Sequence, residues 1–294
     1  MKIDLNVERR HYLKAGLGAV ALGSIATSAC SSTSNVSNEQ KSPRPDLYDL
    51  GDPAQNLEAF VKVMGDLTGR GVWYTAKGRI YLIREGEMPL PFLGVEGLRY
   101  AKFTSIGDGR YLQATRDWAL YRNIQTDQVL AEFDNPLTGQ TVFVHPILTR
   151  YFDWTLDAQT GQIMEGYSGD AYIMERPFLA PWVRDSASMT VTLELLVRYA
   201  SGVGGGEWFN LTAPADQIND PDRPQTAASL AWTGHSPIMS WLNMADIEGR
   251  TLWQSTGQKH SDLSTVSSRF KAELDEVFPG SLYAPETYEK PVKE

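Results

Sequence analysis

The sequence predicts a mainly β fold, a large antiparallel meander that forms a closed or strongly curved barrel, with one N-terminal and one C-terminal helix. Apolar residues recur with a period of two, turn-forming cassettes separate them, and no strand–helix–strand alternation is present. Eight tryptophans and thirteen tyrosines are enough to fill a barrel or to line a cavity inside it. A β-sandwich is the alternative architecture.

Helices are predicted at both ends of the folded part. Asp52 suits the N-cap of the first helix and Pro53 suits its first position. Its apolar residues follow at helical spacing: Leu57, Phe60, Val61, Met64 and Leu67. Pro279-Gly280 ends the second helix. The apolar face of that helix consists of Leu263, Val266, Phe270, Leu274 and Val277.

Strands are predicted between the two helices. Every second residue of the segment 189–199 is apolar, which predicts a strand with one buried and one mostly polar face. A cassette that begins with Asn or Asp and continues with Thr, then Gly or Asp, then Gln recurs at 123–128, 135–140 and 157–162. We expect three hairpin turns of one meander from Arg110 to about Met174.

Glycine-containing segments predict the remaining turns. Three of them are expected to be turns: Lys77-Gly78, Gly107-Asp108-Gly109 and Glu248-Gly249. The segment 202–206 lacks the Lys-Ser or Lys-Thr of a phosphate-binding loop, and it predicts a flexible loop after the strand at 189–199.

Residues 1–29 have the pattern of a twin-arginine export signal. Arg9-Arg10 precede Tyr12-Leu13-Lys14, an apolar run covers 15–26, and small residues occupy 27–29. The apolar run is too short for a spanning helix. The segment predicts export in the folded state by the twin-arginine machinery, to the periplasm or the outer side of a bacterial membrane. An ordinary leader for unfolded export is the alternative.

Cys30 predicts a lipid anchor. It is the only cysteine, so no intramolecular disulfide can form. A lone cysteine after small residues resembles the acceptor of bacterial lipoproteins, and we expect this anchor to be the only attachment to the membrane. Residues 30–45 are polar and predict a disordered tether to one β-rich domain at 46–290. A soluble periplasmic protein cleaved near Ala29 is the alternative.

The charge of the chain argues against nucleic acid as a partner. The net charge is −9, and residues 1–29 carry four basic and two acidic residues, so the remainder carries −11. An acidic chain without a basic run does not attract a phosphate backbone.

Four segments, in their order along the chain, are similar to the domain of unknown function 1838 family. They are 73–81 (WYTAKGRIY), 116–121 (RDWALY), 135–139 (NPLTG) and 232–250, which begins WTGHSPIMSWL and ends Gly249-Arg250. The similarity covers about 46–284. It implies an exported bacterial protein with fungal relatives, and it implies no reaction and no catalytic residue.

No metal or cofactor motif is present in the sequence. His145, His235 and His260 each stand apart from other histidines, and Cys30 cannot contribute to a zinc motif of the folded part. No Gly-x-Ser-x-Gly nucleophile motif occurs. We therefore expect no metal site and identify no cofactor.

Eight residues are candidates for ligand binding or catalysis. They combine aromatic rings with groups that form hydrogen bonds, and such side chains commonly contact ligands. We expect them to line the open end of the barrel: Arg116, Trp118, Tyr121, His145, Trp232, His235, Met239 and Trp241. The alternative is that the same side chains pack in the core.

Three classes of function stay open at this point. The first is a protein that binds an apolar or amphipathic small molecule in an aromatic-lined cavity. The second is a cofactor-independent isomerase, cyclase or lyase that transfers protons through His145 or a carboxylate. The third is a structural envelope lipoprotein whose aromatic residues only fill the core. The sequence does not decide whether the protein is an enzyme.

Overall fold

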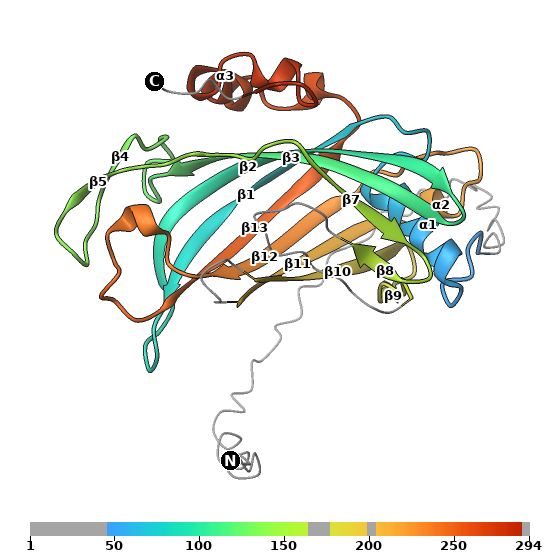
Figure 1. The fold of residues 1–294 in the computed structure, drawn as a ribbon, viewed down its shortest axis with the longest axis horizontal. Coiled ribbons are helices and arrows are strands. Elements are labelled where there is room, and N and C mark those ends of the chain that lie inside the picture. Colours follow the sequence, from blue (N-terminus) through green and yellow to red (C-terminus); the bar gives the residue numbers. More distant parts are fainter. Residues whose placement is uncertain (1–45, 164–176, 199–203, 290–294) are drawn as a thin grey trace, which may run out of the picture. The chain divides into compact units, whose positions relative to one another are not determined.

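The computed structural model describes residues 46–163, 177–198 and 204–289. One eleven-stranded antiparallel sheet dominates it (Figure 1). Its strands are β1 (Val72–Ile83), β2 (Leu90–Gly107), β3 (Arg110–Arg122), β6 (Ile147–Leu148), β7 (Phe152–Asp157), β8 (Gly161–Ile163), β9 (Trp182–Arg184), β10 (Ser188–Arg198), β11 (Gly204–Pro214), β12 (Ser229–Ser236) and β13 (Arg250–His260). The order across the sheet is β8-β7-β3-β2-β1-β13-β12-β11-β10-β9, and β6 also pairs with β3.

The sheet is an antiparallel meander that starts in its own centre. The chain enters at β1, runs outward to β8, and returns from the other edge, β9, through consecutive strands to β13, which pairs with β1. The mainly β, antiparallel prediction is therefore confirmed. β4 (Glu132–Asp134) and β5 (Thr141–Phe143) leave the meander and form a separate two-stranded sheet.

The sheet is strongly curved, and it does not close. The guanidinium carbon of Arg99 on β2 lies 4.9 Å from the ring centroid of Phe209 on β11, although three strands separate β2 from β11. The edge strands β8 and β9 nevertheless do not pair with each other. Of the two predicted forms, a closed barrel is thus wrong, and the strong curvature occurs in an open sheet that has a concave and a convex face.

Helix α1 (Pro53–Met64) occupies the gap that a closed barrel would eliminate. Phe60 of α1 belongs to one buried cluster with Trp154 of β7 and Val191 of β10, which lie near opposite edges of the sheet. Because the helix contributes the apolar surface between these edges, the strands bury their concave face without pairing. Asp52 caps the helix as expected, and its carboxylate accepts a hydrogen bond from the Gln55 amide at 2.9 Å.

The C-terminal end of α1 is held by two side chains of the sheet. The Lys259 ammonium on β13 donates to the carbonyls of Val63 at 3.0 Å and Gly65 at 2.5 Å. The Tyr74 hydroxyl on β1 donates to the carbonyls of Val63 and Met64, each at 3.1 Å. Cations and donors at this end satisfy carbonyls that have no partner within the helix.

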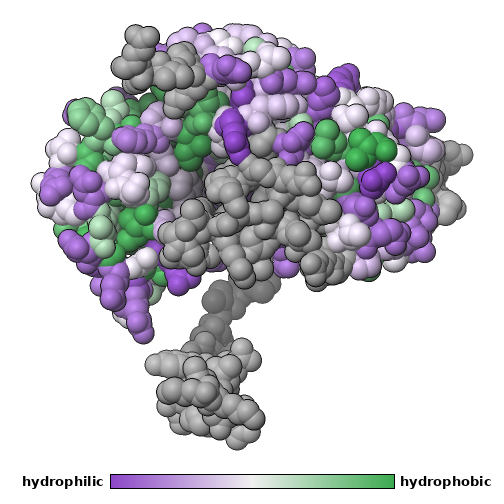
Figure 2. All heavy atoms as spheres, viewed as in Figure 1, coloured by the Kyte–Doolittle hydropathy of each residue, from purple (hydrophilic) through white to green (hydrophobic). Residues whose placement is uncertain are grey.

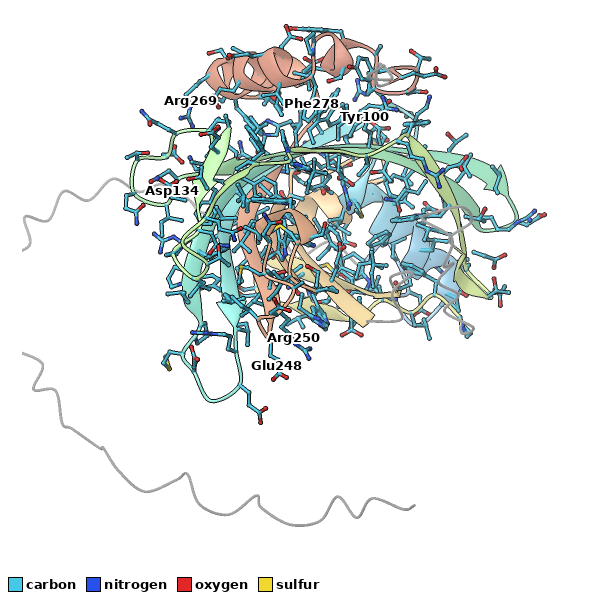
Figure 3. The ribbon with its side chains drawn as sticks, turned by 60° about the vertical axis from the view of Figure 1, so that its left-hand side comes forward. Tyr100, Asp134, Glu248, Arg250, Arg269 and Phe278 are labelled. Carbon is cyan, nitrogen blue, oxygen red and sulfur yellow. The ribbon has the colours of Figure 1, made fainter. Side chains whose placement is uncertain are left out.

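Helix α3 (Ser268–Val277) covers the convex face over β1, β2 and β3 (Figure 1). Phe270 and Leu274 of the helix are fully buried against Trp73 and Trp118. The Trp118 indole donates to the Ser281 hydroxyl at 2.8 Å. Tyr100 and Phe278 lie in this same layer between sheet and helix (Figure 3). The predicted C-terminal helix is confirmed, and its expected first turn is a separate 3₁₀ helix, η2 (Leu263–Thr265).

Three shorter helical segments complete the helices of the described residues. α2 (Ala215–Ile218) follows β11 and adds a third α-helix to the two that were predicted. η1 (Ser240–Leu242) lies between β12 and β13, and η3 (Ser281–Tyr283) follows α3. In the part of the chain that the structure describes, no helix has the length and apolar character needed to cross a membrane.

The three cassettes are turns, as predicted, but they do not all belong to one meander, because the second lies in the separate sheet of β4 and β5. Asn123, Asn135 and Asp157 each use the side-chain oxygen to accept a backbone amide two residues later, at 2.9, 3.0 and 2.7 Å. The second cassette joins β4 to β5 and the third joins β7 to β8. The first turns the chain after β3, where Arg122 bridges to Val129. The end expected for the meander, Met174, lies outside the described residues.

Two glycine predictions need correction. Lys77-Gly78 is not a turn, because it lies within β1 and pairs with Thr256 and Ser255. A Cβ at Gly78 would be 1.8 Å from the Gln254 carbonyl oxygen, so the glycine allows β13 to approach closely. The expected loop at 202–206 is also wrong where it is described, since β11 begins at Gly204.

The packing of α3 gives the first testable prediction. Trp118→Ala should lower the free energy of unfolding by about 3–5 kcal/mol, because it removes a buried indole and leaves a cavity under the helix. Tyr283→Ala is the control, since this side chain is 73 % exposed, and its effect should stay within about 0.5 kcal/mol. Chemical denaturation measures both. Equal losses for the two variants would contradict this account of the convex face.

Candidate functional site

A cavity of about 270 Å³ lies on the concave face of the sheet. Strands β1, β2, β3, β11, β12 and β13 supply most of its lining, and Met64 at the end of α1 also borders it. The volume is near the lower end of ligand pockets, which span roughly 300–1,000 Å³. The cavity therefore suits a small molecule of a few fused or linked rings.

A row of small residues makes the hollow. Neighbouring strands place four of them side by side on the concave face: Gly257, Ala76, Gly97 and Ala119. Larger residues, Leu230 and Ile147, continue the row at its two ends. A Cβ at Gly97 would have ordinary contacts, at 3.4 and 3.9 Å, with two backbone oxygens. The space above Gly97 is thus empty because the sequence supplies no side chain to fill it.

Aromatic rings form one wall of the cavity. The rings of Phe209 and Trp232 are 6.3 Å apart, and those of Trp232 and Trp253 are 6.0 Å apart. The Trp253 indole donates to the Thr251 hydroxyl at 3.0 Å, which fixes its orientation. Large flat apolar surfaces of this kind contact ring-containing ligands at low entropic cost.

An ion pair lies across the cavity from this wall. Asp117 on β3 accepts two hydrogen bonds from Arg99 on β2, at 2.6 Å from Nε and 3.1 Å from Nη2. The Arg99 guanidinium also packs over the Phe209 ring. The Thr149 hydroxyl accepts the backbone N–H of Asp117 at 2.8 Å. This bidentate geometry holds both charges in place within a mostly apolar surface.

Glu207 is the second carboxyl group of the cavity. Gly234 on β12 lies directly opposite it. A Cβ at Gly234 would be 2.8 Å from the Trp232 ring, so the glycine lets the indole lie across it and donate to Glu207 Oε2 at 3.3 Å. Burial and, to a smaller degree, Asp117 raise the pKa of Glu207, whereas Arg99 and the Trp232 hydrogen bond oppose this change. Glu207 therefore retains its proton above the ordinary titration range of a glutamate.

Five of the eight residues predicted for the site form one chain of contacts on the concave side. The His145 and Trp241 rings stack at 6.3 Å, Trp241 contacts Tyr121 at 5.2 Å, and the Tyr121 hydroxyl approaches the Met239 sulfur at 3.2 Å. The Tyr121 ring also contacts the Trp253 ring at 5.9 Å, and Trp253 in turn contacts Trp232 at the cavity. Trp232 alone of these five lines the cavity, and His145 is exposed.

The chain of contacts ends where apolar side chains are visible at the surface. In Figure 2 they gather at the end of the molecule formed by β4, β5 and η1. Phe143 of β5 is 72 % exposed there. Asp134, Glu248 and Arg250 mark the rim of this end in the side view (Figure 3).

The other three predicted residues have their side chains on the convex side. Arg116 and Trp118 alternate with Asp117 along β3, and Arg116 packs over the rings of Tyr151 and Tyr288. The His235 ring lies 5.6 Å from Trp208, whose side chain is on the face opposite that of Glu207. The structure thus does not bring His145 and His235 together, and His235 borders the cavity only as part of its strand.

Sequence reasoning missed Arg99, Glu207 and Trp253. A signal for the first two exists in the sequence. Arg99 interrupts an apolar period-two face of β2, and Glu207 shares a face with Phe209 and Leu211. An isolated charge on the buried face of a strand needs a partner or a function. No group of three or more His, Cys, Asp or Glu side chains that could hold a metal ion occurs within residues 46–163, 177–198 and 204–289.

The family comparison agrees with the resemblance inferred from the motifs. The family model described as Protein of unknown function (DUF1838) matches residues 69–293, and the chain belongs to this family. No curated protein and no solved structure matches the chain.

Glu207→Gln should alter the pH dependence of stability. Because the pKa of Glu207 is raised, the folded protein binds more protons than the unfolded chain above about pH 5. The contribution of Glu207 to the free energy of unfolding therefore falls as the pH rises. The amide cannot ionise, and the variant should become more stable than the wild type with increasing pH. Denaturation at a series of pH values measures this difference.

Glu194→Gln is the control for removal of one carboxylate. Glu194 is exposed and lies opposite Trp208 in the sheet, on the face away from the cavity. Parallel pH profiles for Glu207→Gln and the wild type would show that Glu207 titrates as an ordinary solvated group.

Proposed function

We propose that this member of the family binds a small, mainly apolar molecule in the cavity of the concave face. The observation that carries the proposal is the hollow above Gly97, which is bounded by the aromatic wall on one side and by the Arg99–Asp117 pair on the other. Apolar pockets with a few convergent polar groups are typical of small-molecule sites. Close strand packing requires Gly257, since a Cβ there would be 1.6 Å from the Thr75 carbonyl oxygen, but it does not require Gly97, whose Cβ would have only ordinary contacts.

The size of the cavity restricts the occupant. About 270 Å³ accommodates a bicyclic or short terpenoid-like molecule but not a two-chain lipid. The apolar body would contact Trp232, Trp253 and Phe209, and its polar end would face Glu207 and the ion pair. The ligand class is thus amphipathic, with the apolar part dominant.

A second candidate is a cofactor-independent isomerase, cyclase or lyase that acts on such a molecule. The observation that favours it is Glu207, a carboxyl group with a raised pKa beside a second, ion-paired carboxylate. Two carboxyl groups in different environments can divide the roles of acid and base. Mass spectrometry separates the candidates, because a carrier returns its co-purified ligand unchanged whereas an enzyme releases a product.

The location proposed for the protein rests on residues 1–30 of the sequence. Export would proceed by the twin-arginine machinery through Arg9 and Arg10, and a lipid on Cys30 would tether the protein to the membrane. The acidic charge of the mature part makes anionic head groups a poor additional attachment.

Gly97→Leu is expected to abolish high-affinity binding of an apolar probe. N-phenylnaphthylamine bound in the cavity would receive excitation energy from Trp232 and Trp253. The leucine side chain fills the hollow, and overpacking typically costs about 1–3 kcal/mol, so the dissociation constant should rise roughly 5- to 150-fold. Fluorescence titration measures this change.

Ala231→Leu is the matched control, because Ala231 is exposed on the opposite face of β12. It should bind the probe as the wild type does. Equal affinities of Gly97→Leu and the wild type would place the probe elsewhere and would contradict the proposed site.

Replacement of both Arg9 and Arg10 by lysine should retain the precursor in the cytoplasm, since the twin-arginine machinery reads these side chains. Cys30→Ala should release the exported protein from the membrane fraction. Cell fractionation and immunoblotting measure both effects. Unchanged export in the first variant, or unchanged membrane partitioning in the second, would refute the corresponding part of the proposal.

A further inference from the structure

We propose that the cavity selects neutral molecules that carry a hydrogen-bond-accepting oxygen, and that Glu207 donates the hydrogen bond to this oxygen. The inference rests on the binding function proposed above and names the ligand class of the same site. A ketone, an aldehyde or an ether attached to an apolar ring system has the required chemistry.

The charged groups of the cavity favour a neutral Glu207. Among the described residues that line the cavity, two carboxyl groups, Asp117 and Glu207, lie near the guanidinium of Arg99. Asp117 engages this guanidinium through two hydrogen bonds, at 2.6 and 3.1 Å. If Glu207 ionised, a second carboxylate would lie against the apolar wall, close to one that already engages the guanidinium, and such burial of charge is costly.

The groups that neighbouring strands place near Glu207 also favour its protonated form. β12 contributes the Trp232 indole as a hydrogen-bond donor, β2 contributes Arg99 across the concavity, and β3 contributes Asp117. On β1, the Tyr74 hydroxyl donates to the carbonyls of α1, so it points away from the carboxyl group. Burial together with Asp117 outweighs Arg99 and Trp232, so the pKa of the Glu207 carboxyl group is raised above its ordinary value.

A protonated carboxyl group changes what the cavity recognises. An ionised carboxylate only accepts hydrogen bonds, whereas the acid has an O–H to donate. The Trp232 indole N–H donates to Oε2 of Glu207. The O–H of the protonated carboxyl group is then available to donate to a ligand oxygen. A neutral carboxylic acid in an apolar site is an effective donor to a carbonyl group.

Ser255 supplies an independent observation. Its side chain is 7 % exposed and lines the cavity in the same row of the sheet as Trp232. Among the residues that the structure describes, its hydroxyl has no hydrogen-bond partner. A buried polar group without a partner loses free energy that a bound acceptor oxygen restores. The hydroxyl can donate as well as accept, so it is consistent with a ligand that carries an acceptor oxygen.

The test compares two probes with the same ring system. Prodan is a neutral naphthyl ketone whose emission reports hydrogen bonding to its carbonyl, and its analogue with a propyl group in place of the propionyl group lacks the acceptor. One hydrogen bond should make the ketone bind roughly 3- to 10-fold tighter to the wild type at low pH. This preference should disappear as the pH rises through the titration of Glu207.

Two variants assign the effect to the Glu207 proton. Glu207→Gln keeps a donor that cannot ionise, so the preference for the ketone should persist at every pH. Glu207→Leu removes the donor, so the two probes should bind equally and the emission of bound Prodan should shift to the blue. The infrared carbonyl stretch of bound Prodan should move to higher frequency in Glu207→Leu, because the hydrogen bond is lost.

The outcomes separate this inference from the binding function. Equal affinity of the two probes in the wild type and in both variants would overturn the inference and leave the cavity as a site for apolar molecules. Tighter binding of a cationic amine than of the ketone would also overturn it, because an ionised Glu207 would then be the recognition element. Binding of neither naphthyl probe nor of N-phenylnaphthylamine would overturn the proposed function itself.

Discussion

The small residues Gly257, Ala76, Gly97 and Ala119 are the constraint on which the concave face depends. A sheet curved this strongly brings its inward side chains close together, so ordinary side chains at these positions would fill the centre. The small row instead leaves a hollow, while the larger residues around it pack against α1 at one end and against one another at the other end. The sheet is supported around the hollow because the convex face of β1, β2 and β3 is separately buried beneath α3.

The same curvature explains how polar groups from distant strands meet. Arg99 and Glu207 belong to strands separated by three others, and the bend of the sheet places both at one cavity. The two groups differ in the partners that surround their charge. The guanidinium is neutralised by Asp117, and the Glu207 carboxyl group is left with an indole N–H and an apolar surface. This arrangement underlies the proposed preference for a neutral occupant over an ion.

The sequence predicted local structure well where short-range chemistry determines it. Asp52 and Pro53 define the start of α1, and the Asn and Asp cassettes define three turns, because caps and turns depend on residues within a few positions. Lys77-Gly78 was misread because its glycine serves a distant strand, β13, rather than a turn. The open sheet was missed for a similar reason, since the contact of α1 with strands near both edges is a long-range property.

The candidate site was predicted in part. Trp232 and the ring contacts of Tyr121 and Trp241 follow from the concentration of aromatic residues, whereas Arg99 and Glu207 are recognisable only when each strand is divided into its two faces. A crystal structure of the protein with the naphthyl ketone would show directly whether the hollow binds a neutral ligand through Glu207. The ring should lie beside Trp232 and Phe209, and the ketone oxygen should lie within hydrogen-bond distance of Glu207. A ketone bound elsewhere, with the concave cavity filled by protein side chains, would contradict this proposal.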